Sequence, residues 1–82
     1  MTKTAILATI FALAAPLAQA SNCQHDLREI DKAFAKPRKG VTAENVAEAR
    51  KIRAEGASLC HAGKDEAARD ALRPALRLLK IA

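Results

Sequence analysis

The 82-residue sequence contains no tryptophan or tyrosine and only two phenylalanines. One of the two lies in the N-terminal apolar run, so Phe34 is the single aromatic residue in the remainder of the chain. Proteins that bind single-stranded nucleic acids without sequence preference stack successive bases on aromatic side chains. The sequence therefore offers almost no surface on which bases or sugars could stack, and it predicts no nucleic-acid partner.

Motifs that would carry catalysis are also missing. The sequence has no glycine-rich loop that could cradle a phosphate and no spaced carboxylates of the kind found in a calcium-binding loop. Ser58 has one histidine at a helical contact spacing, His61, and helices contain such pairs by chance. The sequence therefore predicts no catalytic residues and no cofactor, and we expect a protein that is not an enzyme.

The only long apolar run lies at the N-terminus and resembles a secretory signal peptide. Lys3 lies in a short polar lead, residues 5–15 are apolar, and Pro16 precedes a small-x-small sequence that ends at Ala20. This order is typical of a signal that is cleaved on export. A transmembrane helix would need about 20 strongly apolar residues. We therefore expect residues 1–20 to be removed, a periplasmic or secreted location, and no transmembrane segment after cleavage.

The mature protein would then consist of residues 21–82. It keeps every Asp and Glu and loses only Lys3 among the basic residues, so its net charge is 13 minus 9, or +4. This length accommodates one small domain. A core of that size seldom supplies more than ~3 to 5 kcal/mol, so a covalent cross-link would contribute substantially to stability.

Three amphipathic helices are predicted, at about residues 23–36, 43–62 and 66–80, which makes the fold class all-α, a small three-helix bundle. Pro37 ends the first helix. Thr42 is the expected N-cap of the second and Gly63 its left-handed C-cap. Pro74 predicts a kink in the third helix or a break into two shorter pieces. The expected inward-facing residues are Cys23, Leu27, Ile30 and Phe34, then Val46, Ala49, Ile52, Gly56, Leu59 and Cys60, then Ala68, Leu72, Ala75 and Leu79.

The second and third predicted helices carry a spacing of small and apolar residues, consisting of Ile52, Gly56, Leu59, Gly63, Ala68, Leu72 and Ala75. Over Ile52 to Leu78, this order resembles the first helix, turn and second helix of a single tetratricopeptide repeat. The resemblance implies that Gly56 and Ala68 form the close approach between the helices, with Leu59 and Leu72 in the core. About three repeats are needed for the family's concave peptide-binding surface, and one is present. A generic three-helix bundle with the same spacing remains an alternative.

Both cysteines lie in the mature part, where export would expose them to an oxidising compartment. Cys23 begins the first predicted helix and Cys60 lies near the end of the second. If these helices are antiparallel, they rise by about 20 Å and about 26 Å, so the two cysteines come level with each other. A disulfide between Cys23 and Cys60 is therefore expected. A catalytic dithiol would more often form a Cys-x-x-Cys turn, which the sequence lacks.

A metal site is the alternative use of the cysteines. His25 and His61 each lie close to a cysteine, and thiolates together with imidazoles are ligands of zinc and copper. Against this, His25 points roughly 200° around the helix from Cys23, and the spacing matches no standard zinc pattern. An envelope metal-binding protein that uses Cys23, His25, Cys60 and His61 is therefore the second hypothesis, with no metal expected under the first.

Basic residues recur along the third predicted helix at Arg69, Arg73, Arg77 and Lys80. Local pairing, of Arg69 with Asp65 or Glu66 and of Arg73 with Asp70, would make part of this stripe an ordinary solvated face. The functional interpretation is a face for an anionic partner, such as acidic lipid headgroups, a cell-wall polymer or an acidic protein.

Taken together, these patterns predict a small exported helical protein that acts as a non-catalytic protein-interaction module. The expected binding surface is the face of the second and third helices. Exposure of Leu76, Leu78 and Ile81 in the folded monomer would support it.

Overall fold

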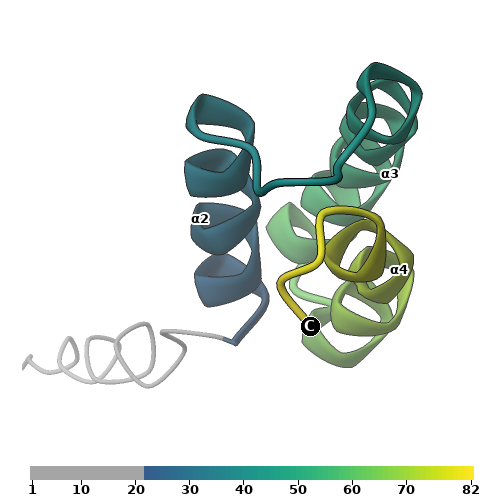
Figure 1. The fold of residues 1–82 in the computed structure, drawn as a ribbon. Coiled ribbons are helices and arrows are strands. Elements are labelled where there is room, and N and C mark those ends of the chain that lie inside the picture. The colour runs from purple at the N-terminus through teal and green to yellow at the C-terminus, as the bar shows by residue number, and fades with distance from the viewer. Residues whose placement is uncertain (1–21) are drawn as a thin grey trace, which may run out of the picture.

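The helical pattern of the sequence produces three helices joined by two short connections. The computed structural model describes residues 22–82. Helix α2 spans Asn22–Ala35, α3 spans Ala43–His61 and α4 spans Asp65–Leu78 (Figure 1). Within these residues the chain contains no strand, and the helix ends differ from the expected ones by two residues at most. The expected signal peptide and its cleavage site lie outside the described residues.

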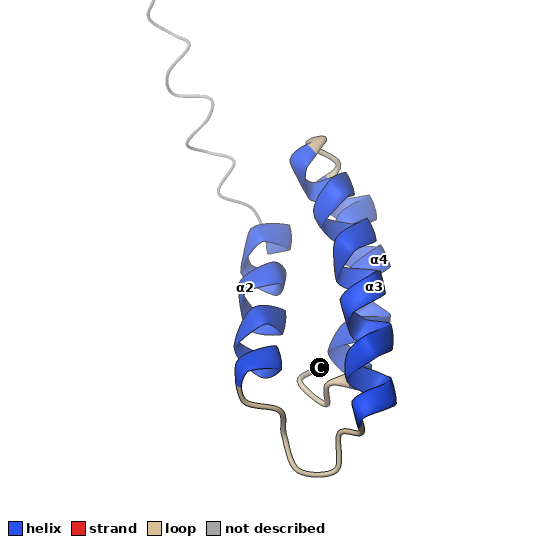
Figure 2. Cartoon of the chain, turned by 90° about the horizontal axis from the view of Figure 1, so that it is seen from above, coloured by secondary structure: helices blue, strands red, loops and turns tan. Residues whose placement is uncertain are grey.

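The helices pack as an up-down-up bundle. Helices α3 and α4 form an antiparallel hairpin closed by residues 62–64, and α2 lies beside this hairpin, antiparallel to α3 (Figure 2). We call the end of the bundle that contains the Cys23–Cys60 bond the disulfide end. The opposite end, which contains the connection 36–42 and residues 79–82, is called the loop end.

The two ends of α3 are formed as the sequence predicts. At its start, Thr42 has an extended backbone and its Oγ1 accepts a hydrogen bond from the Asn45 N–H at 3.1 Å. At its other end, Gly63 adopts a φ of +80°, and the N–H of Lys64 donates to the Leu59 carbonyl at 3.0 Å. A residue in the left-handed region followed by this bond is a Schellman ending, which leaves the chain pointing back along α3.

Helix α4 ends in the same way, but with a residue that the sequence did not mark. Lys80 adopts a φ of +59°, and the N–H of Ile81 donates to the Leu76 carbonyl at 2.9 Å. Non-glycine residues seldom adopt this conformation, so the sequence signal for it is weak. The turn carries Ile81 back toward the bundle.

Of the two outcomes predicted for Pro74, a kink or a break into two shorter pieces, the break does not occur. Helix α4 is continuous over Asp65–Leu78 with Pro74 inside it. Proline removes one N–H, which leaves the Asp70 carbonyl without its usual helical partner. Because Asp70 and Pro74 are both exposed, water can satisfy that carbonyl and the helix tolerates the proline.

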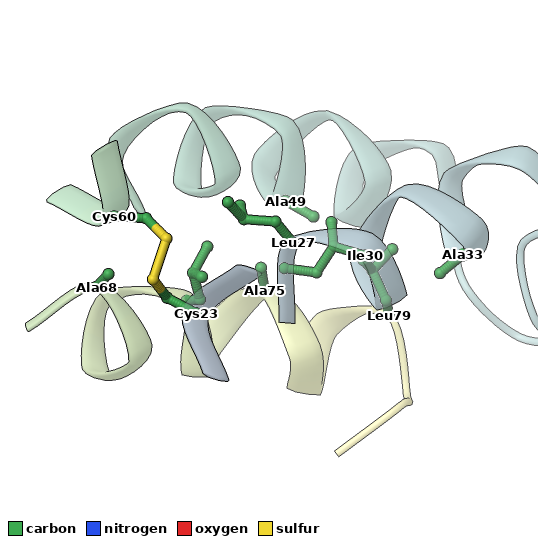
Figure 3. Packing of buried hydrophobic residues seen from close by; sticks show 10 residues of the cluster. Cys23, Leu27, Ile30, Ala33, Ala49, Cys60, Ala68, Ala75 and Leu79 are labelled. Atoms are coloured by element: carbon green, nitrogen blue, oxygen red, sulfur yellow. A yellow bond between two sulfur atoms is a disulfide. The ribbon is translucent and has the colours of Figure 1, made fainter. Parts of the chain in front are cut away.

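The core lies where the three helices meet (Figure 3), and its buried apolar residues are Cys23, Leu27, Ile30, Ala33, Ala49, Cys60, Ala68, Leu72, Ala75 and Leu79. All four residues predicted to face inward from α4 are among them. In α2 the prediction of Phe34 as a core residue needs correction, because Ala33 is buried and Phe34 packs only at the edge. The Arg50 guanidinium covers the Phe34 ring at 4.4 Å from its centroid, and this contact accounts for a half-exposed aromatic residue.

The close approach within the hairpin involves Gly56, but with a different partner from the one that the repeat resemblance implied. Gly56 is buried, and a Cβ atom placed on it would overlap with Cγ and Cδ2 of Leu72. Leu72, and not Ala68, therefore supplies the nearest atoms on that side of Gly56. The absent side chain of Gly56 makes the space that the fully buried Leu72 occupies.

Candidate functional site

The Cys23–Cys60 disulfide is present, as predicted. It joins the first turn of α2 to the last turn of α3, with a Cα–Cα distance of 5.9 Å and a separation of 37 residues in sequence (Figure 3). The cysteines are only 1% and 7% exposed, so the bond lies inside the core. It ties α2 covalently to the hairpin, which places it among the structural elements of the protein.

Polar contacts at the same end connect α2 to α4. Asp65 lies in the first turn of α4, and its Oδ1 accepts a hydrogen bond from the Cys23 N–H at 3.0 Å. A carboxylate at this position accepts a hydrogen bond from a free amide at the start of α2. Its negative charge also interacts favourably with the positive N-terminal ends of the dipoles of α2 and α4. Arg69 forms an ion pair with Asp26 of α2 at 3.6 Å, and not with Asp65 or Glu66 as the sequence predicted. The reason is that α2 brings Asp26 to the face of α4 that carries Arg69.

The four residues of the metal hypothesis do not come together as a ligand set. The sulfurs of Cys23 and Cys60 are bonded to each other, and the side chains of His25 and His61 lie on exposed positions. Among residues 22–82, no three His, Cys, Asp or Glu residues are grouped closely enough to hold a metal ion. Thiolate ligands would require reduction of the disulfide, so the structure of the described residues does not support this hypothesis.

The predicted basic stripe of α4 divides into two halves with different surroundings. Arg69 faces Asp26, and Arg73 forms an ion pair with Asp70 at 3.3 Å, the second of these as the sequence predicted. In the described part of the chain, no carboxylate forms an ion pair with Arg77 or Lys80. The positive charge of the stripe is therefore neutralised toward the disulfide end and uncompensated toward the loop end.

An open groove of about 460 Å³ lies between α3 and α4 near the loop end. We call it the α3/α4 groove, and its lining residues are Asn45, Glu48, Ile52, Pro74, Arg77, Leu78 and Lys80. Its apolar surface comes from Ile52, Pro74 and Leu78, and the charged groups around it are those of Glu48, Arg77 and Lys80. No residue of α2 lines it, so the groove remains accessible in the assembled bundle.

Sequence reasoning found these residues but gave some of them other roles. Ile52 was expected to face the core, yet it is half-buried and lines the groove. Pro74 was interpreted only as a helix breaker. Residues four apart share a helix face, so the spacing of Pro74 and Leu78 was the available signal for a common apolar surface. Leu76, Leu78 and Ile81, whose exposure would support the predicted interaction surface, are each half-buried.

A second hollow, of about 320 Å³, lies between α2 and α3 and is lined by Asp31, Phe34, Arg50, Arg53 and Ala54. Its charged groups bind each other or the ring beside them. The Arg53 guanidinium donates to both carboxylate oxygens of Asp31, at 2.7 and 2.9 Å, while Arg50 covers Phe34. These contacts hold α2 against α3, and they leave the α3/α4 groove as the better candidate for binding a partner.

No described helix is both long enough and apolar enough to cross a membrane. Comparison of the chain with protein-family models, with curated proteins and with solved structures found no match. The functional argument therefore rests on the residues and surfaces described above.

Proposed function

We propose that this protein is an exported helical module, held together by its disulfide, which binds a protein partner through the α3/α4 groove. The observation that carries the proposal is the groove itself, an accessible apolar surface bordered by charged groups. Apolar side chains of a partner would occupy the floor, and polar groups at the edge would orient them.

Export is supported by two independent features. The N-terminal 20 residues have the order of a signal peptide. The mature part contains a buried disulfide, and such bonds persist mainly in oxidising compartments such as the periplasm or the extracellular space. Together they favour a periplasmic or secreted location.

Binding, with no catalytic step, is the role that we propose for the groove. Its lining consists of the apolar side chains of Ile52, Pro74 and Leu78 and the polar or charged side chains of Asn45, Glu48, Arg77 and Lys80. The groove offers shape, apolar area and charge. These are the means by which helix pairs bind peptide segments or partner helices.

We further propose that the α3/α4 hairpin is related to a single tetratricopeptide repeat. The support is the spacing noted in the sequence and the close approach of the two helices at Gly56, although Leu72 makes this approach instead of the implied Ala68. In stacked repeats the peptide surface is built by several hairpins. The proposed groove lies on one hairpin only, so the binding proposal does not depend on this relationship.

Site-specific photo-crosslinking in cells tests the groove. A benzophenone amino acid is placed at Leu78 in the groove or, as the matched control, at exposed Arg28 on α2. We expect irradiation to produce one reproducible protein adduct from position 78 and none from position 28. A second substitution, Ile52→Glu, should abolish the adduct because it places a carboxylate in the apolar floor.

The folding of each variant is checked by its thermal unfolding midpoint, so that loss of the adduct is not confused with unfolding. Equal adducts from the two positions, or an adduct from position 78 that survives Ile52→Glu, would show that the α3/α4 groove is not the binding surface.

A further inference from the structure

A second surface lies at the loop end, where basic residues from two separate segments come together. Lys36, Arg38 and Lys39 lie in the connection 36–42, Arg77 lies in the last turn of α4, and Lys80 follows that helix. Figure 2 shows the connection and the C-terminal segment at this same end. We call these five residues the basic end.

Contacts between the segments hold the basic end together. The Arg38 Nη1 donates to the Lys80 carbonyl at 3.1 Å, and the Lys80 ammonium lies 3.0 Å from the position of a Cβ on Gly40. Lys36 and Arg38 line a shallow hollow of about 220 Å³ together with Ile81. The positive groups of the connection and of α4 therefore form one surface.

Little of this charge is neutralised. Lys32 lies beside the basic end but forms an ion pair with Glu29 at 3.2 Å, so neither of these two contributes net charge. The remaining acidic residues near the start of α3 are Glu44 and Glu48. Five basic residues against two carboxylates leave an excess of 5 minus 2, or three positive charges.

The disulfide end carries little net charge. Its charged side chains are Lys64 and Arg69 against Asp26, Asp65 and Glu66, and cleavage after Ala20 would add one ammonium group directly before Asn22. The excess positive charge is thus concentrated at the loop end of the bundle. A field of this kind turns a molecule as it approaches a charged surface, so that the basic end arrives first at an anionic one.

We propose that the basic end is a membrane-docking surface that binds the anionic headgroups of a phospholipid bilayer. All five basic residues are exposed, and they belong to the connection and to the end of α4, which lie at the same end of the bundle (Figure 2). The half-buried apolar residues Val41 and Ile81, which pack against the core, lie at the same end and add apolar surface beside the basic residues. Long basic side chains can lie along such an apolar region while their charges remain in water.

A bilayer fits this surface better than a small anion does. The shallow hollow is lined by Glu29 as well as by basic residues, so a single phosphate inside it would meet a carboxylate. Of the five residues of the basic end, Lys36 and Arg38 line the hollow and the other three do not. A bilayer presents many headgroups spread over a plane, and each basic residue near such a surface raises the partition coefficient by roughly five-fold.

Vesicle sedimentation tests the proposal with the oxidised, naturally processed protein, whose N-terminus is first verified by its mass. The vesicles contain either equal parts of phosphatidylglycerol and phosphatidylcholine or phosphatidylcholine alone. The test variant is Lys36→Glu with Lys39→Glu. The matched control is Lys51→Glu with Lys64→Glu, which also lowers the net charge of residues 22–82 from 13 minus 9 to 11 minus 11, from +4 to zero, at exposed positions elsewhere.

We expect the unmodified protein to bind the anionic vesicles, to bind less as salt rises, and to ignore phosphatidylcholine. The test variant should lose about 25-fold or more in partition coefficient, two residues at roughly five-fold each, while the control loses much less. Arg77 and Lys80 are unchanged in both variants, so this test is separate from that of the α3/α4 groove.

Three results would overturn the proposal. Absence of binding to anionic vesicles would leave an acidic protein as the partner of this surface. Equal losses in the two double variants would show attraction by net charge without a docking surface. Displacement from the vesicles by glycerol phosphate at the same total phosphate concentration would show a site for small anions instead of a bilayer.

Discussion

Replacing both cysteines by serine should lower the free energy of unfolding by about 4 kcal/mol. The bond closes a loop with a sequence separation of 37 residues, and in the chain-entropy model a cross-link of that span restricts the unfolded chain by about this amount. The expected core of so small a domain supplies no more than ~3 to 5 kcal/mol. Loss of the bond therefore removes stability comparable to that of the whole core. Far-UV circular dichroism during denaturant unfolding would measure it.

Two comparisons separate the cross-link from the effects of serine itself. Unmodified protein in reductant loses the bond without gaining buried hydroxyl groups, and its unfolding midpoint should fall by a similar amount. Reductant should leave the Cys23→Ser/Cys60→Ser variant unchanged. Identical midpoints for oxidised and reduced unmodified protein would show that the bond does not stabilise the fold.

Gly56→Leu should destabilise the oxidised protein more than Leu76→Ala does. Any Cβ at position 56 overlaps with Leu72, which is fully buried and has no free space to enter. Overpacking of this kind typically costs about 1 to 3 kcal/mol and sometimes more. The better helix propensity of leucine offsets somewhat less than ~1 kcal/mol. Leu76 is half-buried, so its truncation should cost well below the roughly 2 to 5 kcal/mol of a buried leucine.

A double-mutant cycle identifies Leu72 as the residue responsible. Gly56→Ala alone should destabilise the protein, because the single added methyl group already overlaps with Leu72. In a Leu72→Ala background the same change should cost much less, since the space has been vacated. Denaturant titration at equal protein concentration would give all four free energies. A stabilised Gly56→Leu variant would mean that position 56 faces solvent, in contradiction of the hairpin packing described above.

The features that sequence reasoning predicted correctly depend on neighbours in the chain. The inward face of α4 follows from helical period, and Thr42 and Gly63 act as caps through residues within five positions of themselves. The disulfide is a long-range exception. It was predictable because the sequence contains two cysteines, both placed where antiparallel helices of similar length would bring them level.

The features that it missed depend on which face of one helix meets another. Two examples are the hydrogen bond from the Cys23 N–H to Asp65 and the ion pair between Arg69 and Asp26, both of which join residues more than 40 positions apart. Helical spacing does not predict partners at such separations. The burial of Ala33 in place of Phe34 is set by the rotation of α2 against the hairpin. A preference for large apolar side chains does not determine that rotation.

Only part of each candidate surface was predicted, because the rest also depends on which helix faces meet. Helical period placed Arg69, Arg73, Arg77 and Lys80 in one stripe, but Asp26 from α2 neutralises one end of it. The other end acquires Lys36, Arg38 and Lys39 because the connection returns beside the end of α4. The α3/α4 groove is accessible only because α2 packs elsewhere on the hairpin. Both surfaces therefore require knowledge of how the three helices are arranged.

The central claim is that the mature protein is an exported domain held together by the Cys23–Cys60 bond, and one intact-mass measurement tests it directly. The protein is isolated from cells that express the full chain, treated with an alkylating agent without reductant, and weighed. The predicted species begins at Ser21, carries no alkyl group and lacks the two hydrogen atoms that leave when the disulfide forms. A species that begins at Met1 and carries an alkyl group on each cysteine would contradict both the export and the bond.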